Sequence, residues 1–257
     1  MTVHIDEFEE PQAAVESDSV SEDAYPDGVD YSGSGEAEDI LAWALDKYHP
    51  SIALSTSFKD GVLIHMLSQI RSDFRVIALD TGRLNEETYE LSEKIRDRYG
   101  VTIEWYFPRP GAVQKLEREK GLFSFKESLE NRRECCYIRK VEPLARALTG
   151  LDAWITGLRR DQGAARAKVG KIELDRVHGD IMKINPLADW DHDRIWAYIK
   201  EHDIPYNKLF DLGYTSIGCE PCTRAIEPGE DARAGRWWWE LEPEHKECGI
   251  HIQDYSI

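Results

Sequence analysis

Residues 51–70 read SIALSTSFKDGVLIHMLSQI, and this stretch carries the pattern that decides the fold. Its first part, SIALST, is a short apolar run that is typical of a buried strand. Its last part, DGVLIHMLSQI, carries apolar residues at helical spacing. The polar turn between the two parts therefore predicts a strand, a turn and a helix in direct succession.

The same alternation continues on both sides of this stretch. The sequence predicts further strands at residues 74–80, 101–107 and 151–157, and helices at 37–49, 85–100, 141–150 and 191–203. Such alternation favours an α/β fold with a mostly parallel sheet and helices on both of its faces. The pattern weakens beyond Asp175, which predicts a loop-rich C-terminal segment. Ligands of such sheets bind beyond the C-terminal ends of the strands.

The acidic charge of the chain is concentrated at its N-terminus. The 257 residues carry a net charge of −17, and residues 1–38 hold 12 of the 49 acidic residues and no Lys or Arg. This segment is also rich in Ser and Gly, so we expect a disordered acidic tail over residues 1–36 and a single domain over 37–257. The charge argues against nucleic-acid binding. With no signal region and no apolar run of ~20 residues, we expect a cytoplasmic protein away from membranes.

Polar turns follow three of the predicted strands. STSFKDG, residues 55–61, could present backbone N–H groups to an anion at a helix N-terminus, although Ser57 or Asp60 could instead only cap that helix. LDTGRLNEET, residues 79–88, could hold a ribose or a base. TGLRRDQGAARAKVG, residues 156–170, carries arginines that suit phosphate or sulfate oxygens, and a solvated basic loop is the alternative.

The five cysteines fall into two pairs and a single residue. Adjacent cysteines, as in ECCYIRK, seldom reach one ion in an ideal tetrahedron, whereas a cluster of several irons relaxes this constraint. Together with GCEPCTR, the two pairs supply the four thiolates that a [4Fe–4S] cluster needs. Two buried cysteines beside an unrelated C-x-x-C pair remain the alternative. Cys248 is left over, beside His245 and Lys246, as a candidate nucleophile.

These motifs together resemble a known family. ECCYIRK, GCEPCTR, GRWWWE and KECGIH, with LSTSFKDG and TGLRRDQ, are similar to the assimilatory adenylyl-sulfate (APS) reductases of the iron–sulfur type, over residues 37–257. The resemblance implies an adenine-nucleotide α-hydrolase-like fold and a catalytic segment over residues 230–257. It also implies a [4Fe–4S] cluster bound by Cys135, Cys136, Cys219 and Cys222, with Cys248 as the catalytic nucleophile.

The resemblance also implies which residues bind the substrate. The modified pyrophosphate loop would contribute Ser55, Thr56, Ser57, Phe58 and Asp60. The other matching positions are Lys140, Gly157, Arg159, Arg166, Arg233, Arg236 and His251. The loop before Arg166 is one residue shorter than in the family pattern.

The implied reaction is the reduction of adenylyl sulfate to sulfite and AMP through an S-sulfocysteine, in sulfate assimilation and cysteine biosynthesis. The expected reductant is thioredoxin or a glutaredoxin-like dithiol protein, and a homo-oligomer is left open. One alternative is the same reaction on the 3′-phosphorylated substrate, PAPS. Another is an ATP-cleaving adenylating or sulfurylase-type enzyme, and a third is a zinc-stabilised binding module, which would leave Cys248 and the arginines unexplained.

Overall fold

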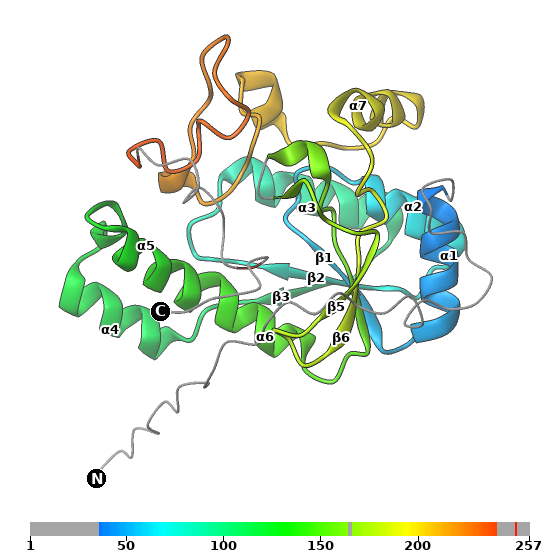
Figure 1. The fold of residues 1–257 in the computed structure, drawn as a ribbon, viewed down its shortest axis with the longest axis horizontal. Coiled ribbons are helices and arrows are strands. Elements are labelled where there is room, and N and C mark those ends of the chain that lie inside the picture. The colour runs from blue at the N-terminus through cyan, green and yellow to red at the C-terminus, as the bar shows by residue number, and fades with distance from the viewer. Residues whose placement is uncertain (1–35, 164–165, 241–249, 251–257) are drawn as a thin grey trace.

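The computed structural model describes residues 36–163, 166–240 and 250 (Figure 1). Its strands are β1 Ile52–Thr56, β2 Arg75–Leu79, β3 Ile103–Tyr106, β4 Ala153–Ile155, β5 Ile172–Asp175 and β6 Ile181–Ile184. Its α-helices are α1 Ala37–Tyr48, α2 Val62–Ile70, α3 Glu86–Tyr99, α4 Pro110–Lys120, α5 Leu129–Cys136, α6 Glu142–Leu148 and α7 His192–Glu201.

The six strands form one sheet in the order β3-β2-β1-β4-β6-β5. All neighbouring strands are parallel except β5, which pairs with β6 in the antiparallel direction. The order reverses between β1 and β4, where the chain turns from one half of the sheet to the other. This is the place at which parallel sheets bind their ligands.

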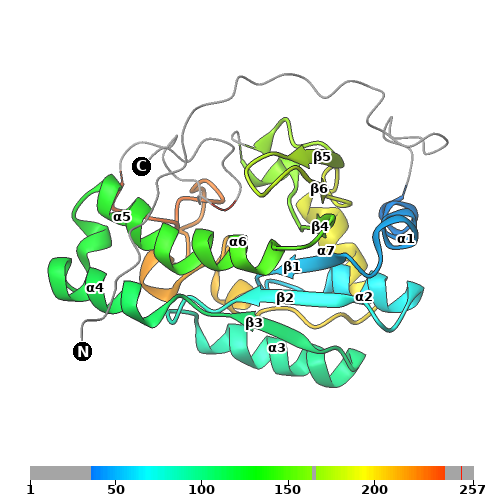
Figure 2. The same cartoon turned by 90° about the horizontal axis from the view of Figure 1, so that it is seen from below.

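Alternate side chains of each strand enter the two halves of the core. Leu54 and Val76 pack with α1, α2 and α7, whereas Ala53 and Ile77 pack with α6 on the opposite face. Figure 2 shows α6 on one side of the sheet and α3 on the other. Buried on both faces, these strands are continuous apolar runs, as parallel strands usually are. The predicted α/β fold is confirmed.

Four elements were not predicted from the sequence: α4, α5, β5 and β6. The helices α4 and α5 contain few apolar residues, and Leu116 is the one buried residue of α4. The hairpin of β5 and β6 is built from strands of four residues each. By contrast, α3 ends at Gly100 as predicted, because Gly100 adopts a left-handed conformation with φ of 64°.

Two predictions lie largely outside these residues. The acidic tail is described only at Glu36, and the C-terminal catalytic segment only at 230–240 and 250. The domain limits therefore stay a prediction. None of the helices in the described ranges is both long and apolar enough to span a membrane.

Candidate active site

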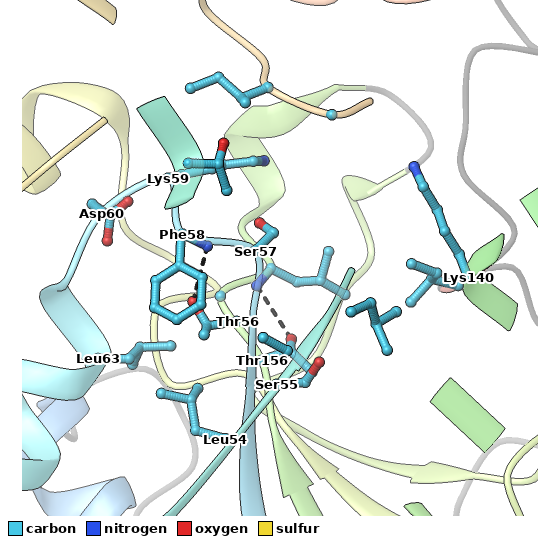
Figure 3. Close-up of a pocket in the computed structure, with 18 of the residues that line it drawn as sticks. Leu54, Ser55, Thr56, Ser57, Phe58, Lys59, Asp60, Leu63, Lys140 and Thr156 are labelled. Atoms are coloured by element: carbon cyan, nitrogen blue, oxygen red, sulfur yellow. Dashed lines mark hydrogen bonds between the residues drawn. The ribbon is translucent and has the colours of Figure 1, made fainter. Parts of the chain in front are cut away.

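A cavity of about 200 Å³ opens at the C-terminal ends of β1, β2 and β4 (Figure 3). Ten of the predicted substrate-binding residues line it: Ser55, Thr56, Ser57, Phe58, Asp60, Lys140, Gly157, Arg159, Arg166 and Arg236. Arg233 does not line it, although its side chain lies against the neighbouring loop, 3.3 Å from a Cβ built on Gly163. Cys248 and His251 lie outside the described residues.

The loop after β1 has a fixed and unusual backbone. Phe58 has a positive φ of 49°, and its N–H donates to Thr56 Oγ1 at 3.2 Å. Asp60 Oδ1 accepts from the N–H of Val62 at 3.1 Å, so this carboxylate satisfies the first N–H of α2, whose N-cap residue is Gly61. Asp60 thus bonds the start of α2 and also lines the cavity. Burial raises the pKa of the Asp60 carboxyl.

Asn207 holds this loop from a segment far away in the sequence. Its backbone N–H donates to the carbonyl of Lys59 at 2.9 Å. Its side-chain amide donates to the carbonyl of Phe58 at 3.2 Å and to Thr88 Oγ1 at 3.1 Å. Asn207 is fully buried. It was missed from the sequence because it lies in a region that showed no motif.

The other two polar turns also reach the cavity. Leu79, Thr81, Leu84 and Thr88 of the second turn line it, as do Thr156 to Arg159 and Gln162 of the third. Arg159 is paired with Asp161 at 3.0 Å, and Arg166 Nη1 donates to Gln162 Oε1. Arg160 instead donates to the carbonyl of Val169. The third turn therefore supplies two arginines to the cavity rather than three.

Arg236 is the most deeply buried cation of this site. Its side chain is packed between Gly218 and the ring of Trp237, whose centroid lies 4.5 Å from Cζ. A Cβ built on Gly218 would lie only 2.5 Å from Arg236 Nη2, so a side chain at this position would displace the guanidinium. Arg236 Nε has no hydrogen-bond acceptor within the described part of the chain. The guanidinium is thus held in place, and its Nε–H remains available to donate to a ligand.

A second, smaller cavity lies beside the first and is lined by all four paired cysteines. Cys135 and Cys136 come from the end of α5, and Cys219 and Cys222 from the 3₁₀ turn Glu220–Cys222 and the residue before it. All four are buried. Burial and the neighbouring Cys219 raise the pKa of Cys222 to about 12. The sequence pairs therefore meet in space as predicted.

Basic and N–H groups surround the cysteines. Arg139 donates to the carbonyl of Thr81 at 2.7 Å and to Glu117 at 2.6 Å, which leaves its Nε without an acceptor among the described residues. Arg83 Nη1 and Trp237 Nε1 are likewise buried without an acceptor in these ranges. No three His, Cys, Asp or Glu side chains in the described residues are placed as ligands of a single metal ion.

The two cavities share Lys140 and Cys219. Lys140 lies in the π-helix Tyr137–Val141, which directly follows the cysteine pair of α5. Such irregular turns are frequent at functional sites because they redirect side chains. The arrangement places one lysine between a basic cavity that suits an anion and a cavity lined by thiols.

Comparison with known proteins agrees with this arrangement. The family described as "Phosphoadenosine phosphosulfate reductase domain" matches residues 49–225. The adenosine 5'-phosphosulfate reductases of Burkholderia cepacia and Allochromatium vinosum are 47% and 49% identical to the chain over 219 and 208 residues. These matches cover 84% and 80% of this chain, and 87% and 80% of those proteins.

A solved structure shares the fold as well. The phosphoadenylyl-sulfate (PAPS) reductase from Candida auris, in its phosphate complex, aligns with a TM-score of 0.62 at 30% identity. The alignment covers 75% of this chain and 91% of that protein. With the family match spanning more than half of its length, the chain belongs to the phosphoadenosine phosphosulfate reductase domain family.

Proposed function

We propose that this chain reduces adenylyl sulfate to sulfite and AMP in sulfate assimilation, with a dithiol protein as the reductant. The observation that carries the proposal is the shared wall of the two cavities, where Lys140 and Cys219 face both the basic site and the cysteines. The predicted resemblance to the adenylyl-sulfate reductases is confirmed by the two curated relatives, which bear that name.

The relatives also bear on the alternatives. Adenosine 5'-phosphosulfate is adenylyl sulfate, and the relatives named for it are 47% and 49% identical to this chain. The structure named for PAPS is 30% identical. The PAPS alternative is therefore not favoured. The family match likewise gives no support to an ATP-cleaving enzyme.

The basic cavity would bind the phosphosulfate anhydride. Arg236 and Arg166 offer forked N–H donors, which suit the oxygens of phosphate and sulfate. The apolar side chains of Leu79, Leu84 and Trp105 line the same cavity and suit the adenine and ribose. Because the cations face a partly desolvated cavity, they neutralise the two charged groups that would otherwise repel an incoming thiolate.

The covalent step would use Cys248. Its thiolate attacks the sulfur atom, a sulfur–sulfur bond forms, and the bond between sulfur and the phosphate oxygen breaks. The oxygen keeps the bonding electron pair and AMP leaves. A dithiol such as thioredoxin then attacks the sulfur of Cys248, and sulfite departs. The two electrons for the reduction come from the dithiol, which ends as a disulfide.

The residues around the paired cysteines fit a [4Fe–4S] cluster. Four thiols from two segments line one cavity, which matches the four thiolates that such a cluster takes. The spare buried donors Arg83 Nη1, Arg139 Nε and Trp237 Nε1 are of the kind that bond to cluster sulfurs. When bound, the cluster would act electrostatically and structurally beside Lys140. Lys140 itself would orient and neutralise the substrate's anionic groups.

The decisive experiment separates the covalent step from the reductive one. Mixing the purified chain with adenylyl sulfate and no dithiol should release AMP in one burst, with the mass of one SO₃ group on the peptide that contains Cys248. Adding thioredoxin should then release sulfite and restore the thiol. The variant Cys248→Ser should keep its iron and bind AMP, but form no adduct.

Two results would refute this mechanism. One is an adduct that maps to another residue, and the other is sulfite production by Cys248→Ser at a rate near that of the parent. The substrate is tested separately, by comparing kcat/KM for adenylyl sulfate and for PAPS. A larger value for PAPS would reverse the substrate assignment.

A further inference from the structure

Lys59 is a basic residue of the main cavity that the sequence motifs did not identify. It lies in the loop between β1 and α2, between Phe58 and Asp60, and lines the cavity. Figure 3 shows Lys59 and Lys140 on opposite sides of this space, with their ammonium ends directed into it. Within the described residues the Lys59 ammonium makes no hydrogen bond or ion pair.

The backbone of Lys59 is fixed, which limits where its side chain can go. Its carbonyl accepts from the N–H of Asn207 at 2.9 Å. The preceding carbonyl, of Phe58, accepts from the Asn207 side chain at 3.2 Å, and the following residue, Asp60, forms a bridge with Tyr206. Because this backbone is already fixed, binding of a ligand has to order only the Lys59 side chain.

The surroundings of Lys59 are basic from several directions. Besides burial, the positive charges of four arginines disfavour the charged form of Lys59 and so lower its pKa. They come from the loop after β4 and from the C-terminal part of the chain: Arg159, Arg166, Arg233 and Arg236. Lys140 faces it across the cavity, and Asp60 is the adjacent carboxylate, engaged by the N–H of Val62. Burial, followed by the charge of Arg166, lowers the pKa of Lys59 to about 7. An anion in the cavity would reverse this effect, because it favours the charged ammonium.

We propose that Lys59 is a further substrate-binding residue, whose ammonium contacts the phosphate of the nucleotide from its side of the cavity. The inference rests on the proposed function. It assigns a phosphate-binding residue to the side of the cavity opposite Lys140. Lys59 directly precedes Asp60 and Gly61, the residues that lead into α2.

The contact strengthens as the reaction proceeds. The phosphate carries one negative charge in adenylyl sulfate and about two in AMP above pH 6. When the sulfur–oxygen bond breaks, the phosphate oxygen keeps the electron pair, and an ammonium that donates a hydrogen bond to it stabilises the departing AMP. Lys59 keeps its proton throughout this step. Interactions that grow toward the transition state raise kcat as well as kcat/KM.

Calorimetric titration with AMP tests the contact without the chemistry of the thiol. Between pH 7 and 9 the phosphate of AMP stays doubly charged, so its own titration does not interfere. At pH 7 a large share of Lys59 is already charged, so affinity is highest at this end of the range. As the pH rises above 7, binding requires proton uptake, and Kd should rise by up to about tenfold per pH unit until the pKa of the bound state is reached.

Two variants separate charge from structure. Lys59→Met should bind AMP at least about tenfold more weakly at pH 7, with a Kd that no longer depends on pH. Lys59→Arg should bind close to the parent value and likewise be flat with pH, since arginine stays charged. The control Lys94→Met removes an exposed lysine paired with Glu90 in α3, and should behave as the parent does.

Proton uptake gives a second readout. Heats measured at pH 8 in two buffers of different ionisation enthalpy should show nearly one proton taken up per AMP by the parent and none by either Lys59 variant. Parent-like affinity and uptake in Lys59→Met would overturn the assignment, and so would an absence of AMP binding in the parent. If AMP behaves as expected but adenylyl sulfate yields no sulfite, the reductase proposal fails and Lys59 remains a ligand of the nucleotide phosphate.

Discussion

Replacing Gly218 by alanine should displace the Arg236 side chain without any mutation of Arg236 itself. A Cβ built at residue 218 would lie 2.5 Å from Nη2, 2.6 Å from Cζ and 3.0 Å from Nη1 of Arg236. Real Cβ atoms do not approach so closely, and the obstructing atoms belong to the far end of a long side chain. We therefore expect the guanidinium to move out of its position while the backbone stays.

The magnitude follows from the contact that is lost. A charge-assisted hydrogen bond from arginine to an anion contributes about 1–3 kcal/mol. Losing it should lower kcat/KM for adenylyl sulfate by about 5- to 150-fold, at 1.36 kcal/mol for each factor of ten. Overpacking itself should cost about 1–3 kcal/mol in the free energy of unfolding. The chain should therefore still fold.

A double-mutant cycle tests whether the effect runs through Arg236. We would measure kcat/KM with adenylyl sulfate and excess dithiol for the parent, Gly218→Ala, Arg236→Ala and the double variant. If the new methyl group acts by displacing Arg236, the double variant should match Arg236→Ala. Because Cys219 is adjacent, iron content is measured for each variant to separate loss of arginine from loss of iron.

Gly111 provides the matched control. A Cβ at residue 111 meets no atom within 4 Å, and this glycine lies in the helix α4, so Gly111→Ala should leave kcat/KM unchanged and slightly raise stability. The reasoning would be refuted by parent-like kcat/KM in Gly218→Ala. It would equally fail if the two single effects simply multiplied in the double variant.

The remaining predictions concern the cysteines, the loop clamp and the tail. Serine in place of any one of the paired cysteines should remove iron and activity together; these are Cys135, Cys136, Cys219 and Cys222. Normal iron content in one variant would exclude that residue as a ligand. Asn207→Ala should raise KM and lower the free energy of unfolding in urea by about 1–3 kcal/mol, because Phe58 and Thr88 lose a buried donor; unchanged values of both would contradict the clamp. Arg233→Ala should lower kcat/KM by about 5- to 150-fold, which corresponds to about 1–3 kcal/mol of lost transition-state binding. An unchanged kcat/KM would place this residue outside the anion site. Deleting residues 1–36 should leave turnover nearly intact, and a large loss would give the tail a role.

The fold was predictable where apolar residues recur with a period. The strands β1, β2 and β4 are short apolar runs because both faces are covered, and α2 and α3 carry a clear apolar side. The helix α5 shows no such side, because its buried residues are Arg132, Cys135 and Cys136. A helix that buries a cation and two thiols against a site gives no signal that a search for apolar periodicity can read.

The site was predictable where residues adjacent in sequence share a task. The loop over residues 55–60 and the two cysteine pairs are local patterns, so a chemistry could be predicted for them before their place was known. Asn207 offers no such pattern. Its role depends on three hydrogen bonds, to Phe58, Lys59 and Thr88. These residues lie between 119 and 149 positions away in the sequence. Only the folded chain brings these groups together.

The role of each lysine depends on the same long-range geometry. Lys59 and Lys140 are 81 positions apart in the sequence, yet they face one cavity from opposite sides, and Lys140 also borders the cysteines. On the proposed function, a change of charge among the cysteines would reach the anion site through Lys140, whereas Lys59 would respond to the anion itself and to the arginines. The affinity for AMP should consequently fall in the cysteine variants as well as in Lys59→Met, but only the Lys59 variants should abolish proton uptake.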